Sequence, residues 1–86
     1  MSRAVPEWAG RTDDTPIPPR VKIRVFEAQD GLCAHCEAKM GTGGKSPEFD
    51  HKVALANGGE NRESNIQALC RPCHRAKTNV DVAQKS

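Results

Sequence analysis

The residues with the clearest chemical role are four cysteines arranged as two similar pairs. Cys33 and Cys36 form one C-x-x-C pair, and Cys70 and Cys73 form a second pair after a gap of 33 residues. Two such pairs suit a tetrahedral zinc site, although the gap is longer than in the commonest zinc fingers. Disulfides are the alternative. The N-terminus lacks the apolar segment of a secretion signal, however, and paired cysteines in a reducing compartment more often bind metal. The spacing therefore favours structural zinc.

Four polar residues have no role in a structural zinc site formed by the four cysteines. Asp50 and His51 are adjacent, so on a strand their side chains point to opposite faces, and one can bind a metal while the other faces a substrate. His74 follows Cys73 and, on a helix, lies about 100° around the axis from it, so it can serve a second metal centre. Asp50 and His74 are therefore a candidate pair for a catalytic divalent ion, with open positions for water and phosphate. Asn65 is the fourth polar residue.

Two other function classes compete with catalysis. A non-catalytic zinc-ribbon module that binds nucleic acid or protein explains the cysteines and basic residues but leaves Asp50, His51 and His74 unused. The segment Cys70 to His74 also matches the C-x-x-C-H string of c-type haem attachment, which requires export and leaves the first cysteine pair unexplained. A P-loop is not present in the glycine-rich segment 41–46, because Lys39 stands where its first glycine is needed.

The size and composition of the chain explain why a staple is needed. With 86 residues it forms one domain at most, and a domain of this size buries only about 60% of the surface of its unfolded chain. The apolar inventory is small, with a hydrophobic fraction of 36%, two Phe and one Trp. A net charge of +2 permits nucleic-acid binding without demonstrating it. No segment has the length needed to span a membrane.

The first element that must position these residues is a predicted helix over 20–30. Prolines precede it and Gly31 follows it, which is the usual punctuation of a helix. An apolar stripe runs through Val21, Val25, Ala28 and Leu32. The alternation of apolar and basic residues over 21–25 also allows a strand.

The segments that carry the polar residues are short. Residues 48–53 and 66–69 are predicted strands, and residues 56–60 form a turn with the Asn57-Gly58 dipeptide. Pro72 fits the first turn of a second helix. The expected order is helix, cysteine pair, strand, loop, strand, cysteine pair, helix.

This combined pattern resembles the HNH endonuclease family. The matching segments are Cys33-x2-Cys36, Asp50-His51, Asn57-Gly-Gly-Glu60-Asn61, Asn65-Ile-Gln, Cys70-x2-Cys73-His74 and Lys77. His51, Asn65 and His74 supply the three letters of the family name in order, and the resemblance covers roughly residues 20–78. It implies a ββα-metal core in which a hairpin and a helix hold one divalent ion. The expected fold is thus a small α+β zinc-stapled domain, with an HNH core and an N-terminal helix.

The resemblance also implies a role for each residue. His51 would be the general base that deprotonates the attacking water, since an imidazole is largely neutral near pH 7. Asp50 and His74 would hold a divalent ion that neutralises the phosphate and stabilises the leaving 3′ oxygen. Mg²⁺, Mn²⁺, Ni²⁺ or Zn²⁺ would suit this pair. Asn65 would pin the loop between the strands and orient His51, and the four cysteines would be structural.

The domain organisation follows from the same resemblance. Residues 18–78 would be the HNH nuclease domain with its four-cysteine zinc site. Residues 1–17 are rich in Pro, Gly and charge and read as a flexible N-terminal arm, in which Trp8 either packs on the domain or contacts a partner. Residues 79–86 would be a frayed C-terminal tail.

The implied activity is metal-dependent hydrolysis of DNA phosphodiester bonds. Arg75 and Lys77 are candidate phosphate contacts, with a plain solvated helix face as the alternative. Specific DNA interfaces bury about 1,000 Å² or more, so we expect weak sequence specificity, with targeting left to a protein partner or to self-association. A single general base favours a nickase. The chain resembles the compact standalone kind of HNH protein of bacteria and phage, which implies a cytoplasmic location in a bacterium or phage-infected cell.

Overall fold

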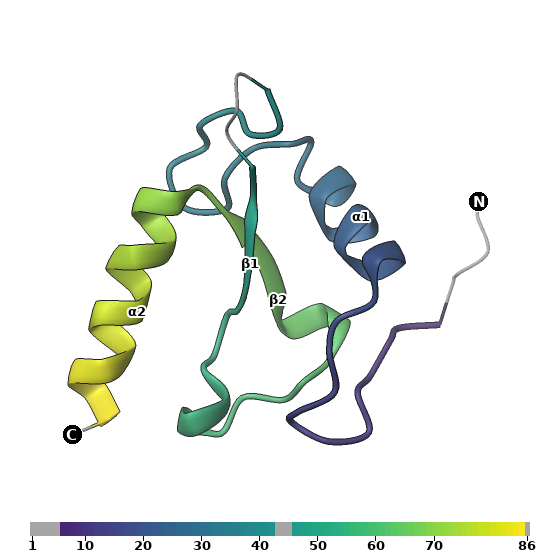
Figure 1. Cartoon of the computed structure of the whole chain (residues 1–86), viewed down its shortest axis with the longest axis vertical. Coiled ribbons are helices and arrows are strands. Elements are labelled where there is room, and N and C mark those ends of the chain that lie inside the picture. Colours follow the sequence, from purple (N-terminus) through teal and green to yellow (C-terminus); the bar gives the residue numbers. More distant parts are fainter. Residues whose placement is uncertain (1–5, 43–45, 86) are drawn as a thin grey trace.

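Two helices flank a two-stranded antiparallel sheet in the part of the chain that the structure describes, residues 6–42 and 46–85 (Figure 1). The structure is a computed structural model. Its helices and strands are α1 (Pro19–Ala28), β1 (Glu48–His51), β2 (Ile66–Leu69) and α2 (Arg71–Lys85), with short 3-10 helices at Leu55–Asn57 and Glu63–Asn65. Because β1, β2 and α2 form a ββα unit, the predicted small α+β fold is confirmed.

Helix α1 forms between prolines, which favour a helix start, and a glycine, which favours a helix end. Pro18 is extended, and Pro19 takes the first helical position, where its fixed φ suits a helix and its missing N–H costs nothing. The helix ends two residues earlier than predicted, because Asp30 and Gly31 adopt the left-handed conformation (φ 55° and 71°). Gln29 then joins the helix end to β2, since its amide donates to Ala68 O (3.0 Å) and accepts from Ala68 N (2.9 Å).

The hairpin places the two catalytic candidates of β1 opposite β2. Asp50 pairs with Gln67 and His51 with Ile66 in the antiparallel register. Residues 66–69 form a strand as predicted, but β1 stops at His51 instead of reaching residue 53. It stops because the backbone of Val53 hydrogen-bonds the side chain of Asn65 rather than a neighbouring strand.

Helix α2 is longer than predicted. It runs from Arg71 to Lys85, so the frayed tail expected from residue 79 onward is helical through residue 85. Residues 74–85 contain neither Gly nor Pro, so nothing in the sequence breaks the helix that starts at Arg71. No helix among the described residues is both long enough and apolar enough to cross a bilayer.

The N-terminal arm also differs from the expectation of a flexible segment. Its described residues run beside the loop that connects β1 to β2, and Ala9 forms an isolated antiparallel bridge with Arg62. The backbone N–H of Glu63 donates to Trp8 O (2.8 Å), and that of Gly10 donates to Asn61 O (2.8 Å). These hydrogen bonds hold the arm, and the half-buried Trp8 packs against the core as the packing alternative proposed.

The core is small and lies between α1 and the sheet. Its buried apolar residues are Val21, Val25, Cys33, Met40, Ile66, Ala68 and Leu69. Helix α1 packs on β2, whereas α2 contacts β1. Cys33 belongs to this core, whereas Cys36 of the same pair is exposed.

Candidate active site and zinc cluster

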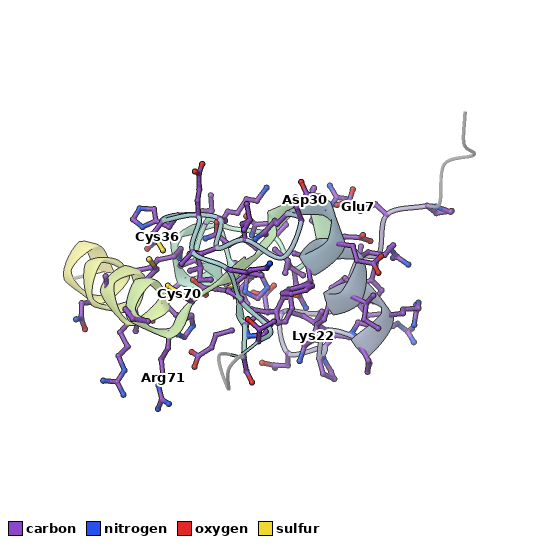
Figure 2. All side chains as sticks on the ribbon, turned by 90° about the horizontal axis from the view of Figure 1, so that it is seen from above. Glu7, Lys22, Asp30, Cys36, Cys70 and Arg71 are labelled. Carbon is purple, nitrogen blue, oxygen red and sulfur yellow. The ribbon has the colours of Figure 1, made fainter. Side chains whose placement is uncertain are left out.

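All four cysteines come together at one end of the sheet. Their sulfur atoms lie within 4.8 Å of one another, and the Sγ atoms of Cys36 and Cys70 are 3.6 Å apart. Figure 2 shows these two residues side by side near the start of α2. A tetrahedral zinc with Zn–S bonds of about 2.3 Å requires S–S separations of about 3.8 Å, whereas a disulfide requires about 2.05 Å. The four clustered cysteines therefore fit a structural zinc site.

Cys33 is the cysteine best prepared to be a thiolate. Burial acts to raise its pKa, but hydrogen bonds from the backbone N–H groups of Cys36, Cys70 and His35 outweigh it and lower the pKa to about 6. Hydrogen bonding to Cys70, together with burial, raises the pKa of Cys73 to about 12. Zinc binding must therefore displace protons that the neighbouring sulfurs otherwise hold.

One face of β1 presents two carboxylates to α2. Glu48 and Asp50 alternate along the strand, so they share a face. Glu48 Oε1 lies 2.9 Å from His74 Nδ1, and Asp50 Oδ2 lies 3.0 Å from Lys77 Nζ. The structure thus brings the predicted ligands Asp50 and His74 into the same interface between β1 and α2.

The types of donor atom in this interface are those that a divalent cation uses. Asp50 Oδ2 is buried and accepts no hydrogen bond from the described residues, although the Lys77 ammonium lies 3.0 Å away as an ion-pair partner. His74 Nδ1 lies 2.9 Å from Glu48 Oε1, and a ring proton on that nitrogen would leave the lone pair on Nε2 for a metal. A carboxylate oxygen and an imidazole nitrogen are usual ligands of Mg²⁺, Mn²⁺ and Ni²⁺ sites.

His51 is held on the other side of the strand by a residue that the sequence reasoning missed as functional. Its Nε2 lies 3.0 Å from Oδ1 of Asn61, whose side-chain amide is buried with 7% of the residue exposed. Asn61 Nδ2 donates to the backbone carbonyls of Thr12 and Thr15, both at 2.9 Å. No spacing rule could have found this contact, because Asn61 stands in a turn and its other partners lie about 46 residues away in the arm.

Comparison with known proteins agrees with this arrangement. The sequence profile of the family described as HNH endonuclease matches residues 32–80, which is more than half of the chain and includes the cysteine cluster, His51, Asn65 and His74. The chain belongs to the HNH endonuclease family. A CRISPR-associated endonuclease Cas9 of Actinomyces naeslundii is 33% identical over 64 residues, which are 73% of this chain but only 6% of that protein. No solved structure matches the chain. HNH membership supports a nuclease function in general.

Asn65, the asparagine of the HNH pattern, forms three hydrogen bonds within the loop between the strands. Its Oδ1 accepts from Val53 N (2.9 Å), and its Nδ2 donates to Val53 O (3.0 Å) and Glu60 O (2.8 Å). Among the described residues, however, the side chain that accepts a hydrogen bond from the His51 ring is that of Asn61. Asn65 thus shapes the loop, whereas the direct orientation of His51 belongs to Asn61.

The two basic residues suggested as phosphate contacts have different surroundings in this HNH protein. Arg75 is exposed on α2. Lys77 is 18% exposed in its side chain, and its ammonium lies beside Asp50, which is 21% exposed. Arg71, exposed at the start of α2, is 4.0 Å from Glu48. Arg71 and Arg75 are therefore more accessible to solvent on α2 than Lys77 is.

Proposed function

We propose that this chain is a metal-dependent DNA endonuclease that nicks one strand, with His51 as general base. The observation that carries the proposal is the hydrogen bonding of His51. Asn61 can donate only from Nδ2, and Nδ2 is committed to two backbone carbonyls, so its Oδ1 is an acceptor and His51 Nε2 must donate. A neutral imidazole carries one N–H, so the lone pair of His51 is on Nδ1, ready to accept a proton.

The proposed reaction is hydrolysis at phosphorus. Nδ1 of His51 takes a proton from water as the water oxygen bonds to phosphorus, the P–O3′ bond breaks, and the 3′ oxygen acquires a proton from solvent. Asp50 and His74 would hold the divalent ion, which supplies charge neutralisation at the phosphate and stabilises the leaving oxygen. Glu48, whose Oε1 lies 2.9 Å from His74 Nδ1, would favour a proton on that nitrogen and thus the tautomer that a metal ligand requires.

DNA is the proposed substrate because of family membership and exposed basic residues. The family description and the matched relative both carry the word endonuclease. Arg71 and Arg75 are exposed on α2, the helix that also carries His74. Because the chain spans only 6% of the length of that relative, target selection by this chain alone is proposed to be weak, with a partner or self-association supplying it.

The test is nicking of supercoiled plasmid by zinc-loaded protein in Mg²⁺, Mn²⁺ or Ni²⁺. We expect His51→Ala to reduce the rate about 100-fold to 10,000-fold, the usual contribution of a general base. His35→Ala is the matched control, because His35 is exposed in the first cysteine pair and should leave the rate unchanged.

Equal zinc content in all three proteins prevents a folding defect from being mistaken for lost catalysis. Nicking that persists at the wild-type rate in His51→Ala would reject His51 as the base. If zinc-loaded wild type binds DNA but cleaves nothing with any of the three ions, the chain is a zinc-ribbon binding module instead.

A further inference from the structure

The described part of the N-terminal arm is bound to the loop that carries Asn61, although it lies outside the segment matched by the family. Besides the backbone hydrogen bonds of Trp8 and Gly10, Trp8 N donates to Glu63 Oε1 (3.1 Å) and Ser64 N donates to Glu7 Oε2 (2.8 Å). The arm therefore follows the loop residue by residue instead of touching it at one point.

Charged groups strengthen this attachment. Arg24 of α1 donates twice to the Glu63 carboxylate, from Nε at 2.9 Å and from Nη2 at 2.8 Å. These hydrogen bonds hold the pKa of Glu63 below its usual range. Hydrogen bonds from Ser64 likewise lower the pKa of Glu7. Both carboxylates thus remain charged acceptors that join the arm, the loop and α1.

A turn in the arm presents two carbonyl groups to Asn61. Thr15 N donates to Thr12 O (3.2 Å), and Thr12 N donates to Thr15 Oγ1 (3.1 Å), which closes the turn. Both of its carbonyls accept from Asn61 Nδ2 at 2.9 Å. Since a backbone carbonyl can only accept, the turn decides which way round the Asn61 amide lies.

We infer that the N-terminal arm is a positioning element of the nuclease site, which fixes the tautomer of His51 through Asn61. This inference rests on the proposed role of His51 as general base. Without the arm carbonyls the amide is free to rotate, and its Nδ2 can then donate to His51 Nε2. That reversal moves the ring proton to Nδ1 and removes the lone pair that the attacking water needs.

Gly10 offers a way to displace Asn61 without touching either catalytic candidate. A Cβ at this position would lie 2.5 Å from Asn61 Nδ2, 3.0 Å from Thr15 Cβ and 3.2 Å from Asn61 Cγ. Gly10 is not in the left-handed region, so alanine adds crowding there without backbone strain. Ala9→Ser is the matched control, since it adds one heavy atom at the neighbouring, exposed residue.

The experiment compares wild type, Gly10→Ala and Ala9→Ser as full-length, zinc-loaded proteins. Nitrogen NMR of the histidine rings at mildly alkaline pH reports the tautomer of His51, which is assigned by its absence from His51→Ala. We expect the Nε2–H tautomer in wild type and Ala9→Ser, and a mixture or the Nδ1–H tautomer in Gly10→Ala. The nicking rate of Gly10→Ala should fall on the order of tenfold or more at unchanged DNA affinity, as for other histidine bases with a misplaced proton.

The tautomer measurement separates this inference from the proposed function, because it requires no cleavage. If Gly10→Ala keeps a pure Nε2–H tautomer, the arm does not position His51 and the inference is wrong. If wild type cleaves nothing but Gly10→Ala still differs from it in the His51 tautomer, the inference is supported while the nuclease is rejected. Should Gly10→Ala not fold, Asn61→Ala is the second variant. It removes Oδ1, the acceptor for His51 Nε2–H, without adding volume, and it should also give a mixture of the two His51 tautomers.

Discussion

At the residue scale, the two histidines of the site have opposite ring nitrogens committed to their neighbours. His51 Nε2 is hydrogen-bonded to Asn61, whereas His74 Nδ1 forms an ion-pair contact with Glu48 at 2.9 Å. The first arrangement leaves Nδ1 to accept a proton, and the second leaves Nε2 to bind a metal. In the proposed mechanism, one amide and one carboxylate would thus direct two chemically identical side chains to different tasks.

The carboxylate of Glu48 gives a prediction about metal affinity. Glu48→Gln retains an acceptor for His74 Nδ1–H but removes the charge that makes the imidazole a better ligand. Changes at such outer positions commonly cost about tenfold to 100-fold in affinity, so calorimetry with Mn²⁺ on zinc-loaded protein should show about a tenfold loss. Glu27→Gln, an exposed substitution on α1, controls for the change in net charge. Equal losses in both variants would show that Glu48 acts only through long-range charge.

Removal of the Lys77 charge should strengthen Mn²⁺ binding, whereas removal of the Glu48 charge should weaken it. Its ammonium lies 3.0 Å from Asp50 Oδ2 and must be displaced before a cation reaches that oxygen. Partly exposed ion pairs are worth up to about 1 kcal/mol, so Lys77→Met should tighten Mn²⁺ binding about fivefold. Arg75→Met removes the same charge from an exposed position of α2 and should have a smaller effect. Weaker Mn²⁺ binding by Lys77→Met in calorimetry would mean that the lysine supports the site instead of competing for it.

At the element scale, the loop between β1 and β2 depends on Asn65. Its amide bridges Val53 near the loop start and Glu60 near the loop end with three hydrogen bonds. Asn65→Asp keeps the acceptor for Val53 N but turns a carboxylate oxygen toward two carbonyls that need a donor. Zinc-loaded Asn65→Asp should therefore lose about 1 kcal/mol or more in the free energy of unfolding by denaturant.

The matched control for this loop variant is Asn57→Asp. Asn57 is exposed in the same loop, so the chemical change is identical but no carbonyl pair is left without a donor. Equal destabilisation of the two variants would indicate a general charge effect rather than a tie made by Asn65.

The sequence predicts an element well when the residues that start and end it are neighbours in the chain, and poorly when distant residues decide where it ends. Helix α1 and strand β2 were predictable because prolines, a glycine and apolar patterning mark them directly. The end of β1 was not predictable, because Asn65, fourteen positions beyond the end of that strand, captures the backbone of Val53. The arm was not predictable either, since it is held by backbone groups, which carry no sequence pattern, and by side chains about 50 positions away in the sequence.

The same distinction applies to the site. Asp50, His51 and His74 are recognisable from their types and neighbours, and the fold brings Asp50 and His74 to one interface. Asn61 and Glu48 are ordinary polar residues in the sequence, and only the packing of the arm and of α2 gives them partners. What the sequence misses are therefore the residues that orient the chemistry.

At the scale of the whole molecule, the zinc cluster connects the parts that hold the site. Cys33 and Cys36 follow α1, whereas Cys70 and Cys73 join β2 to α2, so a zinc ion held by all four would link the N-terminal helix to the ββα unit. The buried apolar core is small, and a core of this size rarely stabilises a chain of 86 residues unaided. The position of His74 relative to β1 would then depend on a metal that takes no part in the proposed reaction.

Removal of zinc should consequently unfold the molecule. Structural zinc contributes on the order of 10 kcal/mol or more in small domains, which exceeds what this core can supply. Complete chelation should abolish the cooperative thermal transition in circular dichroism, and added zinc should restore it. Asp50→Ala separates the two metal centres, because it should keep the zinc-dependent transition while losing Mn²⁺ binding. A cooperative transition that survives complete chelation would show that packing between α1, the arm and the sheet holds the fold without the four cysteines.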